Sequence, residues 1–363
     1  MMATKNISAD YLVQAWQERY VPDFLTICSK ENYLDFYDLL KLTSYQEKAK
    51  TVEKARCLLK IHCECSSTKD NIVFSYIPHI IKLSDFEKIA LYIQLTYEKL
   101  LSVYQQQSPL NISGEILSQA RPILRKIDIS SEFFENWLMP TLRLSMVEQL
   151  YKEIQPTLLE LREKHLITND LRLIGFISTQ FNFSTAFIFN ELKLAEQLLL
   201  SPYFKFVEEQ VCIPWQRVCN AAAAHSPNSK SLAIVRRMLP ASREIAYAVH
   251  QRASEIYPNH SSRRGKLNDS GVKASSIRDI EMFQAYLWLC LLEESMEAVE
   301  RELLPLCVLV FPSIEVEWEL VEQTVPLLTA EFGHRLEAEQ MRLLRPYTQA
   351  MQQILSKPRM KIV

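Results

Sequence analysis

Glycine is the residue type that most constrains this chain, because only 5 of its 363 residues are glycine. The average share in proteins is about 7%. Glycine adopts positive φ without steric cost, and so it serves tight hairpin turns, β-bulges and phosphate-binding loops. A chain with so little glycine has few places for such turns. We therefore expect an all-α protein with no significant β-sheet.

The hydrophobic pattern indicates amphipathic helices. In the segment 84–105, apolar residues recur three and four positions apart, which is the period of one helix face. Ser84 and Glu87 form a capping box at the start of this segment. Ser276, and Ser201 with the proline that follows it, are typical of helix N-termini, so we expect further helices to begin there.

The length of the chain predicts more than one compact core, because domains cluster at about 100 to 200 residues. We expect a two-part multi-helix bundle, with one elongated array as the alternative. The polar segment 105–114 is the best candidate boundary. It predicts an N-terminal helical bundle at 1–107, a linker at 108–113 and a larger C-terminal helical domain at 114–363. Residues 258–276 hold two of the five glycines and are typical of a mobile loop.

Charge and cysteine usage indicate a soluble protein of a reducing compartment. The formal net charge is −2, which gives no overall attraction to nucleic acid or to an anionic membrane. No secretory signal pattern is visible, and the apolar runs are too short for a bilayer span. The 8 cysteines have no disulfide-scaffold spacing. We expect a cytoplasmic location and no membrane span.

Catalytic sequence motifs are specific indicators of common enzyme classes. The chain has no glycine-rich phosphate loop, no nucleophile elbow, no HExxH motif and no kinase loop set. The shortage of glycine also disfavours hidden versions of these loops. We therefore interpret the chain as a protein that is not an enzyme and that binds no cofactor.

One segment concentrates soft metal ligands, namely Cys57, His62, Cys63 and Cys65. On a single helix Cys63 and Cys65 would project about 200° apart, so they could not share one metal ion. The motif Glu-x-x-His occurs once, at 331–334, whereas a di-iron bundle needs two such motifs and further glutamates. We favour packed or surface thiols and predict no bound metal.

The segment 168–197 has polar and apolar residues at spacings that matter for DNA recognition. A small residue, an asparagine, a serine and two apolar residues follow in order at Ser178, Asn182, Ser184, Ile188 and Leu192. This order resembles a prokaryotic helix-turn-helix motif, in which asparagine opens the turn and serine caps the second helix. The resemblance implies an outward, DNA-facing helix surface formed by Thr185, Ala186, Phe189, Asn190 and Lys193.

An alternative interpretation of the same segment is a phenylalanine-rich helical hairpin in the core of a bundle. Phe176, Phe183 and Phe187 would then be core residues. Phe189 favours this alternative, because a phenylalanine is a poor partner for a phosphate-lined groove.

Charge is segregated in the C-terminal third. Cations gather between Lys230 and Arg278, and acids follow between Glu293 and Glu322. The two blocks could pair with each other inside the fold, or the basic block could face nucleic acid, a phosphorylated protein or an acidic partner. The candidate contacts to nucleic acid or another anionic partner are Thr185, Asn190, Lys193, Arg236, Arg237, Arg263, Arg264 and Lys266.

The segment 276–296 is apolar on more than one face, so we expect a helix that is central to a bundle or covered by a partner. With no motif for catalysis, we expect a non-enzymatic regulatory or scaffold protein that acts through helix-face protein–protein contacts. The alternative is a DNA-binding transcriptional regulator that uses the segment 168–197 and the basic stretch 230–278. The expected partner is thus a protein, with nucleic acid as the second candidate.

Overall fold

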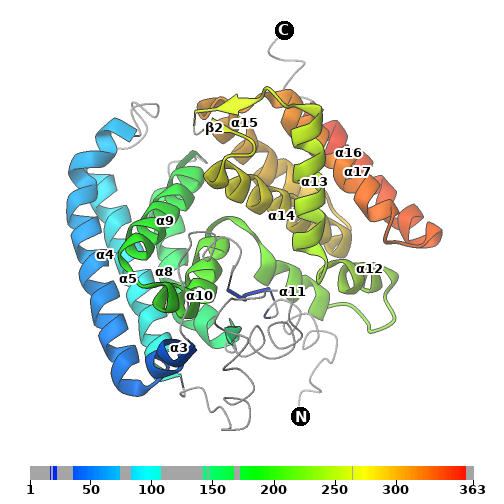
Figure 1. Ribbon diagram of the computed structural model, residues 1–363. Coiled ribbons are helices and arrows are strands. Elements are labelled where there is room, and N and C mark those ends of the chain that lie inside the picture. The colour runs from blue at the N-terminus through cyan, green and yellow to red at the C-terminus, as the bar shows by residue number, and fades with distance from the viewer. Residues whose placement is uncertain are drawn as a thin grey trace. The chain divides into compact units, whose positions relative to one another are not determined.

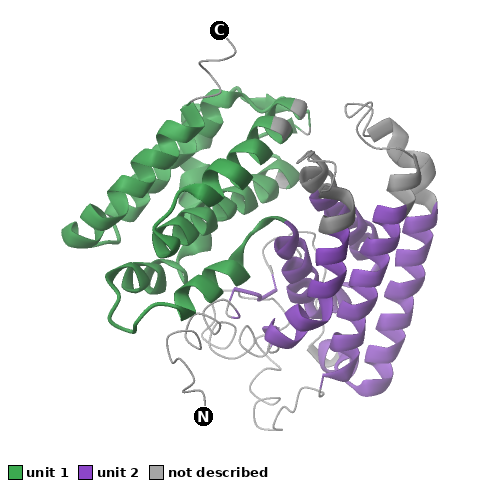
Figure 2. Ribbon diagram, turned by 180° about the vertical axis from the view of Figure 1, so that it is seen from behind, with its two compact units in different colours: residues 1–16, 171–175, 212–363 green, residues 17–170, 176–211 purple. Residues whose placement is uncertain are grey.

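The computed structural model describes residues 17, 19–22, 36–73, 83–107, 142–144, 147–166, 172–263 and 265–356. Regular structure in these ranges is helical apart from one two-stranded hairpin. The expected all-α class is confirmed. The chain divides into two compact units (Figure 2). Unit 1 comprises residues 1–16, 171–175 and 212–363, and unit 2 comprises residues 17–170 and 176–211.

The helices that lie wholly or mostly in unit 2 are labelled in Figure 1. They are α3 (Phe36–Leu42), α4 (Tyr45–Val73), α5 (Leu83–Gln106), α8 (Val147–Leu166), α9 (Arg172–Glu191) and α10 (Leu194–Cys212). Helix α5 packs against α4 and against α8. The fully buried Tyr97 stacks on Phe204 at 4.7 Å and meets Phe181 edge-on at 5.4 Å, measured between ring centroids. These aromatic contacts tie α5, α9 and α10 into one core.

Helix α5 confirms the helix expected around residues 84–105, but the helix start expected at Ser201 is wrong. Pro202 lies inside the continuous helix α10. Proline has no N–H to donate to the carbonyl four residues earlier, here that of Leu198. The Ser201 hydroxyl donates to this carbonyl instead, at 3.1 Å. A local side-chain donor thus lets the helix continue through the proline.

Unit 1 contains the remaining described helices. They are α11 (Trp215–Ala223), α12 (Lys230–Met238), α13 (Ser242–Ile256), α14 (Ser270–Glu293), the π-helical turn η2 (Val299–Leu303), α15 (Leu304–Ser313), α16 (Trp318–Gly333) and α17 (Ala338–Ser356), with strands β1 (Ser261–Ser262) and β2 (Gly265–Lys266) between α13 and α14. Ser229 caps α12, since its hydroxyl oxygen accepts a hydrogen bond from the Leu232 N–H. Such caps satisfy the free N–H groups of a helix start.

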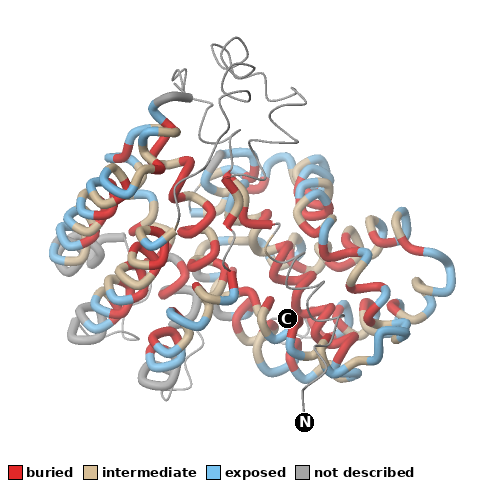
Figure 3. Tube along the Cα trace, turned by 90° about the horizontal axis from the view of Figure 1, so that it is seen from below, coloured by how far each residue is buried: buried red, intermediate tan, exposed pale blue. Residues whose placement is uncertain are grey.

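Helix α14 is the central helix of unit 1. It packs against α11, α12, α13, α16, α17 and η2. Residues 280–292 are all buried, and Trp288 contacts the Phe332 ring at 5.0 Å between centroids. Most other helices show buried and exposed residues in alternation (Figure 3). The expectation of a helix central to a bundle is confirmed.

The segment 258–276, expected to be a mobile loop, contains a hairpin and the first turns of a helix. Ser261 pairs with Lys266, and Ser262 pairs with Gly265, in an antiparallel hairpin. The Arg263 N–H donates to the Ile314 carbonyl at 3.0 Å, which attaches this hairpin to the end of α15. Helix α14 already begins at Ser270. Hydrogen bonds and the burial of Leu267, which is 6% exposed, hold this polar segment in place.

Ser276 is therefore inside α14 and does not start it. Its hydroxyl lies 3.0 Å from Nδ1 of His250 on α13, so this serine joins two helices instead of capping one.

The two compact units do not follow the expected domain boundary. The expected linker at 108–113 lies outside the described residues. Helices α5 and α8, which precede and follow it, pack against each other in unit 2. The change from unit 2 to unit 1 occurs at Cys212, the last residue of α10. No polar or glycine-rich segment marks this position, which explains why composition did not indicate it.

Candidate functional site

The expected helix-turn-helix does not form. Helix α9 runs without a break from Arg172 to Glu191, so the expected turn at Asn182 lies within the helix. The Ser184 hydroxyl donates to the Gln180 carbonyl at 2.9 Å, one turn earlier. This bond is compatible with a helix interior, whereas a capping serine would accept from a following N–H. The chain bends instead at Leu192 and Lys193, between α9 and α10.

Two side chains of α10 stabilise the bend through hydrogen bonds. The Glu196 carboxylate accepts a hydrogen bond from the Lys193 N–H at 2.8 Å. The Gln197 amide donates to the carbonyls of Phe189 and Leu192 at 2.7 and 2.9 Å. These bonds satisfy the N–H group that precedes α10, one carbonyl in the last turn of α9 and the carbonyl just after that helix.

The phenylalanines of α9 only partly match the alternative core hairpin. Phe181 is fully buried, whereas Phe183 and Phe187, which were expected in the core, are half-buried. The Phe187 ring lies 5.0 Å from the His62 ring of α4, and burial lowers the pKa of His62. The side chain of Phe176 lies outside the described residues. The helical period places Phe181, rather than its neighbours, toward Tyr97.

The candidate DNA contacts of unit 2 differ in their exposure to solvent. The hydroxyls of Thr185 and Tyr97 lie 2.8 Å apart, and Thr185 also donates to the Phe181 carbonyl at 3.1 Å. Thr185 therefore faces the core, contrary to the expected outward position. Asn190 and Lys193 are exposed at the end of α9 and in the bend.

The candidate contacts of unit 1 come from two places, helix α12 and the β1–β2 hairpin. Arg236 is half-buried, and Arg237 bonds Glu337 at 3.3 Å. On the hairpin, the Arg263 guanidinium donates to Glu315 at 2.9 Å, and Lys266 is exposed. Arg264 lies outside the described residues.

Many cations of the basic stretch 230–278 have acidic partners within unit 1. These ion pairs are Lys230–Glu339, Arg237–Glu337, Arg243–Glu281, Arg252–Glu255, Arg263–Glu315 and Arg278–Asp279. Of these, Arg263–Glu315 joins the basic block to the acidic block 293–322. Internal pairing is thus present, although most acids in these pairs lie outside the acidic block. The pairs reduce the charge that the stretch presents to an anionic partner.

The soft-ligand segment 57–65 lies on α4. The Cys63 thiol donates to the Ala90 carbonyl on α5 at 3.5 Å, while His62 contacts α9 and Cys57 is exposed. The side chain of Cys65 is outside the described residues. Within the described part of the chain, no three His, Cys, Asp or Glu side chains gather as ligands for a metal ion.

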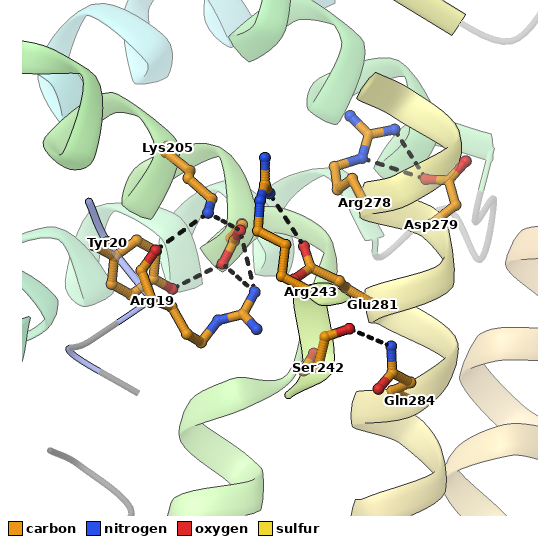
Figure 4. A network of polar contacts seen from close by, with 10 residues as sticks. Arg19, Tyr20, Lys205, Ser242, Arg243, Arg278, Asp279, Glu281 and Gln284 are labelled. Atoms are coloured by element: carbon orange, nitrogen blue, oxygen red, sulfur yellow. Dashed lines mark hydrogen bonds and ion pairs between the residues drawn. The ribbon is translucent and has the colours of Figure 1, made fainter. Parts of the chain in front are cut away.

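A buried polar network in unit 2 escaped the sequence analysis (Figure 4). The Glu209 carboxylate on α10 accepts a hydrogen bond from the Tyr20 hydroxyl at 2.9 Å and lies 3.3 Å from the Arg19 guanidinium. The Lys205 ammonium is 3.7 Å from the same carboxylate and donates to the Arg19 carbonyl at 3.3 Å. The network fixes the short segment 19–22 to α10. Sequence offered only the spacing of Lys205 and Glu209, four residues apart.

The outward face of α5 is the second feature that the sequence analysis missed. Leu91 and Leu95 are 52% and 40% exposed, and their spacing of four residues places them on one helix face. Ile89 and Ile93, on the opposite side of the same helix, are buried. Helical period separates the two sets, but it could not tell which set is exposed, because α5 carries apolar residues on both faces.

In the described residues, no helix has both the length and the apolar character needed to cross a bilayer. Comparisons of the chain with protein-family models, with curated proteins and with solved structures found no match. Its function is therefore inferred from its own residues and their contacts.

Proposed function

We propose that this chain is a regulatory or scaffold protein that binds a partner protein through an exposed helix face of α5. The observation that carries the proposal is the exposure of Leu91 and Leu95 at 52% and 40%. Two apolar residues four positions apart match the anchor spacing with which helix faces dock into apolar grooves. Fully burying one leucine side chain contributes about 1.5–3 kcal/mol, so this pair is a source of binding energy.

The surroundings of the two leucines support a protein contact. Lys88 lies one turn before Leu91, and Glu98 and Lys99 lie one turn after Leu95. The face therefore has an apolar centre and charged ends, as protein interfaces commonly have. The opposite face of α5 packs against α4 and α8, which holds the leucines on a rigid element and lowers the entropy cost of binding.

Site-specific photo-crosslinking in cells tests this function. A benzophenone amino acid at position 95 is expected to capture a defined partner protein. The same group at position 50, an exposed lysine of α4 in an ion pair with Glu47, is the matched control. Leu91→Lys combined with Leu95→Lys is expected to abolish co-purification of that partner while helix content and unfolding temperature are retained. Equal crosslinking at both positions would contradict the proposal.

We do not propose DNA binding through 168–197, because α9 lacks the turn that the helix-turn-helix motif requires. A duplex DNA binding assay at increasing salt tests this inference. We expect no binding at low salt. Binding that weakens steeply with salt and is reduced by Lys193→Ala would restore the DNA-binding alternative.

A further inference from the structure

Helices α13 and α14 of unit 1 bring an exposed aromatic ring and two cations together. The Tyr247 ring is 5.4 Å from the Arg243 guanidinium carbon and 5.7 Å from the Lys273 ammonium, measured to the ring centroid. Tyr247 is 37% exposed, and Lys273 is exposed. Both distances are within the range of cation–π attraction. The three side chains therefore form one positively charged, aromatic cluster.

Buried groups beneath this cluster hold it in place. The Glu281 carboxylate, 1% exposed, lies 3.7 Å from the Arg243 guanidinium (Figure 4). The Gln284 amide, one turn further along α14, donates to the Ser242 carbonyl at 2.9 Å. These contacts fix the start of α13 on α14. The cluster thus stands on two packed helices, and little side-chain and backbone freedom remains to be lost on binding.

The charge of Lys273 also affects His250, which lies in the contact between α13 and α14. Burial lowers the pKa of His250, and the nearby Lys273 ammonium lowers it further. His250 lies 3.0 Å from the Ser276 hydroxyl, so its imidazole bridges α13 and α14. A histidine whose pKa is lowered stays neutral at neutral pH. The positive charge here therefore comes from Arg243 and Lys273.

We propose that Tyr247, Arg243 and Lys273 form a docking site for an acidic segment of a partner protein. Tyrosine and arginine are enriched among the residues that dominate binding energy at protein interfaces. Carboxylates complement the exposed Lys273 ammonium and the guanidinium of Arg243, which also lies beside Glu281. This site does not depend on the α5 face.

The size of the cluster favours an acidic protein segment over nucleic acid. Nucleic-acid binding draws its affinity from many phosphate contacts, whereas this cluster has two cations, one of which lies beside Glu281. Other cations of the basic stretch form ion pairs, for example Arg237 with Glu337 and Arg252 with Glu255. Two cations around one aromatic ring suit a short segment with a few carboxylates.

A fluorescein-labelled octaglutamate peptide, with octaglutamine as the neutral control, tests the proposal on the full chain. Fluorescence anisotropy at low salt is expected to show that octaglutamate binds and that octaglutamine does not. Tyr247→Ala and Lys273→Ala are each expected to raise the Kd about fivefold or more, the threshold of a significant interface residue. Arg252→Ala is the matched control on α13 and is expected to leave the Kd within about twofold, because Glu255 already engages this arginine.

Three outcomes would overturn the proposal. Octaglutamate could fail to bind, or Arg252→Ala could weaken its binding as much as Lys273→Ala does. A single-stranded oligonucleotide of equal charge could also bind more tightly than the peptide and depend on Tyr247 and Lys273, which would assign the site to nucleic acid. Circular dichroism on each variant verifies that helix content is unchanged.

Discussion

The Arg19 guanidinium lies 3.3 Å from the Glu209 carboxylate, and the two side chains are 5% and 3% exposed. Buried charges are costly to remove from water, and the attraction between them offsets that cost only when both partners are present. Tyr20 donates a further hydrogen bond to the same carboxylate, and the Tyr20 carbonyl accepts from the Leu144 N–H at 2.9 Å. Glu209 is thus the centre of a contact that gathers distant parts of the sequence in unit 2.

Replacing Glu209 by alanine leaves the Arg19 guanidinium in a buried site without its carboxylate. We expect Glu209→Ala to lower the free energy of unfolding by about 3–5 kcal/mol. Urea denaturation followed by circular dichroism measures the change. Glu297→Ala is the control, because it removes an exposed i,i+4 pair with Arg301, and such pairs contribute little. Equal effects of the two substitutions would show that the buried pair adds no specific stability.

Three buried tyrosines are expected to make the fold sensitive to alkali. Burial raises the pKa of Tyr97, Tyr104 and Tyr203 above the ordinary value of 10.0. The folded chain keeps phenol protons that the unfolded chain loses above this pH. Their stabilising effect is therefore complete below pH 10 and declines as pH rises, by about 1.4 kcal/mol per pH unit for each tyrosine.

Absorbance at 295 nm and circular dichroism, recorded together from neutral pH upward, check the alkaline prediction. These tyrosines should ionise only as helix content is lost. Tyr97→Phe removes one such proton, so the free energy of unfolding should decline less steeply with pH above 10. An unchanged slope in this variant would contradict the assignment.

The described cysteines are expected to differ in reactivity toward iodoacetamide. Burial, with help from Glu98 and Glu64, raises the pKa of Cys63 to about 12, so about one thiol in ten thousand is a thiolate at pH 8. Cys57 is exposed on the same helix. Peptide mass spectrometry should therefore find Cys57 alkylated well before Cys63. In urea the difference should disappear, and its persistence there would rule out folding as its cause.

Two glycines of the same region are expected to respond oppositely to alanine. Gly265 has φ of 120°, and an added Cβ would overlap a carboxylate oxygen of Asp269. Gly265→Ala should therefore destabilise unit 1, by about 1–3 kcal/mol. At Gly271, in the first turn of α14, a Cβ would meet no atom within 4 Å. Gly271→Ala should stabilise by about 0.4–1 kcal/mol. Thermal unfolding of both variants measures the contrast.

The helical class could be predicted because it depends on local properties. The period of apolar residues in α5 specifies a helix wherever it packs, and a shortage of glycine limits tight turns along the whole chain. Helix boundaries could be predicted less well from the sequence. The Ser201 hydroxyl supplies the hydrogen bond that Pro202 cannot, so α10 continues through a residue pair typical of a helix start.

The candidate site depended on longer-range contacts. Asn190 and Lys193 are exposed, as a surface role requires, but Thr185 faces Tyr97. Arg263 finds its partner Glu315 52 positions away in the sequence. The sequence gives the charge of each residue. The positive charge left on the surface depends on which cations form ion pairs with acids after folding.

The amino-acid sequence by itself thus determined the helical class, the apolar α14 and the absence of familiar catalytic motifs. Tertiary structure decided that the units divide at Cys212, that Leu91 and Leu95 remain exposed, and that Tyr247 meets two cations. The physical reason is the range of the interactions. Helix formation reflects neighbours within about four residues, while burial and charge pairing are properties of side chains that only packing brings together.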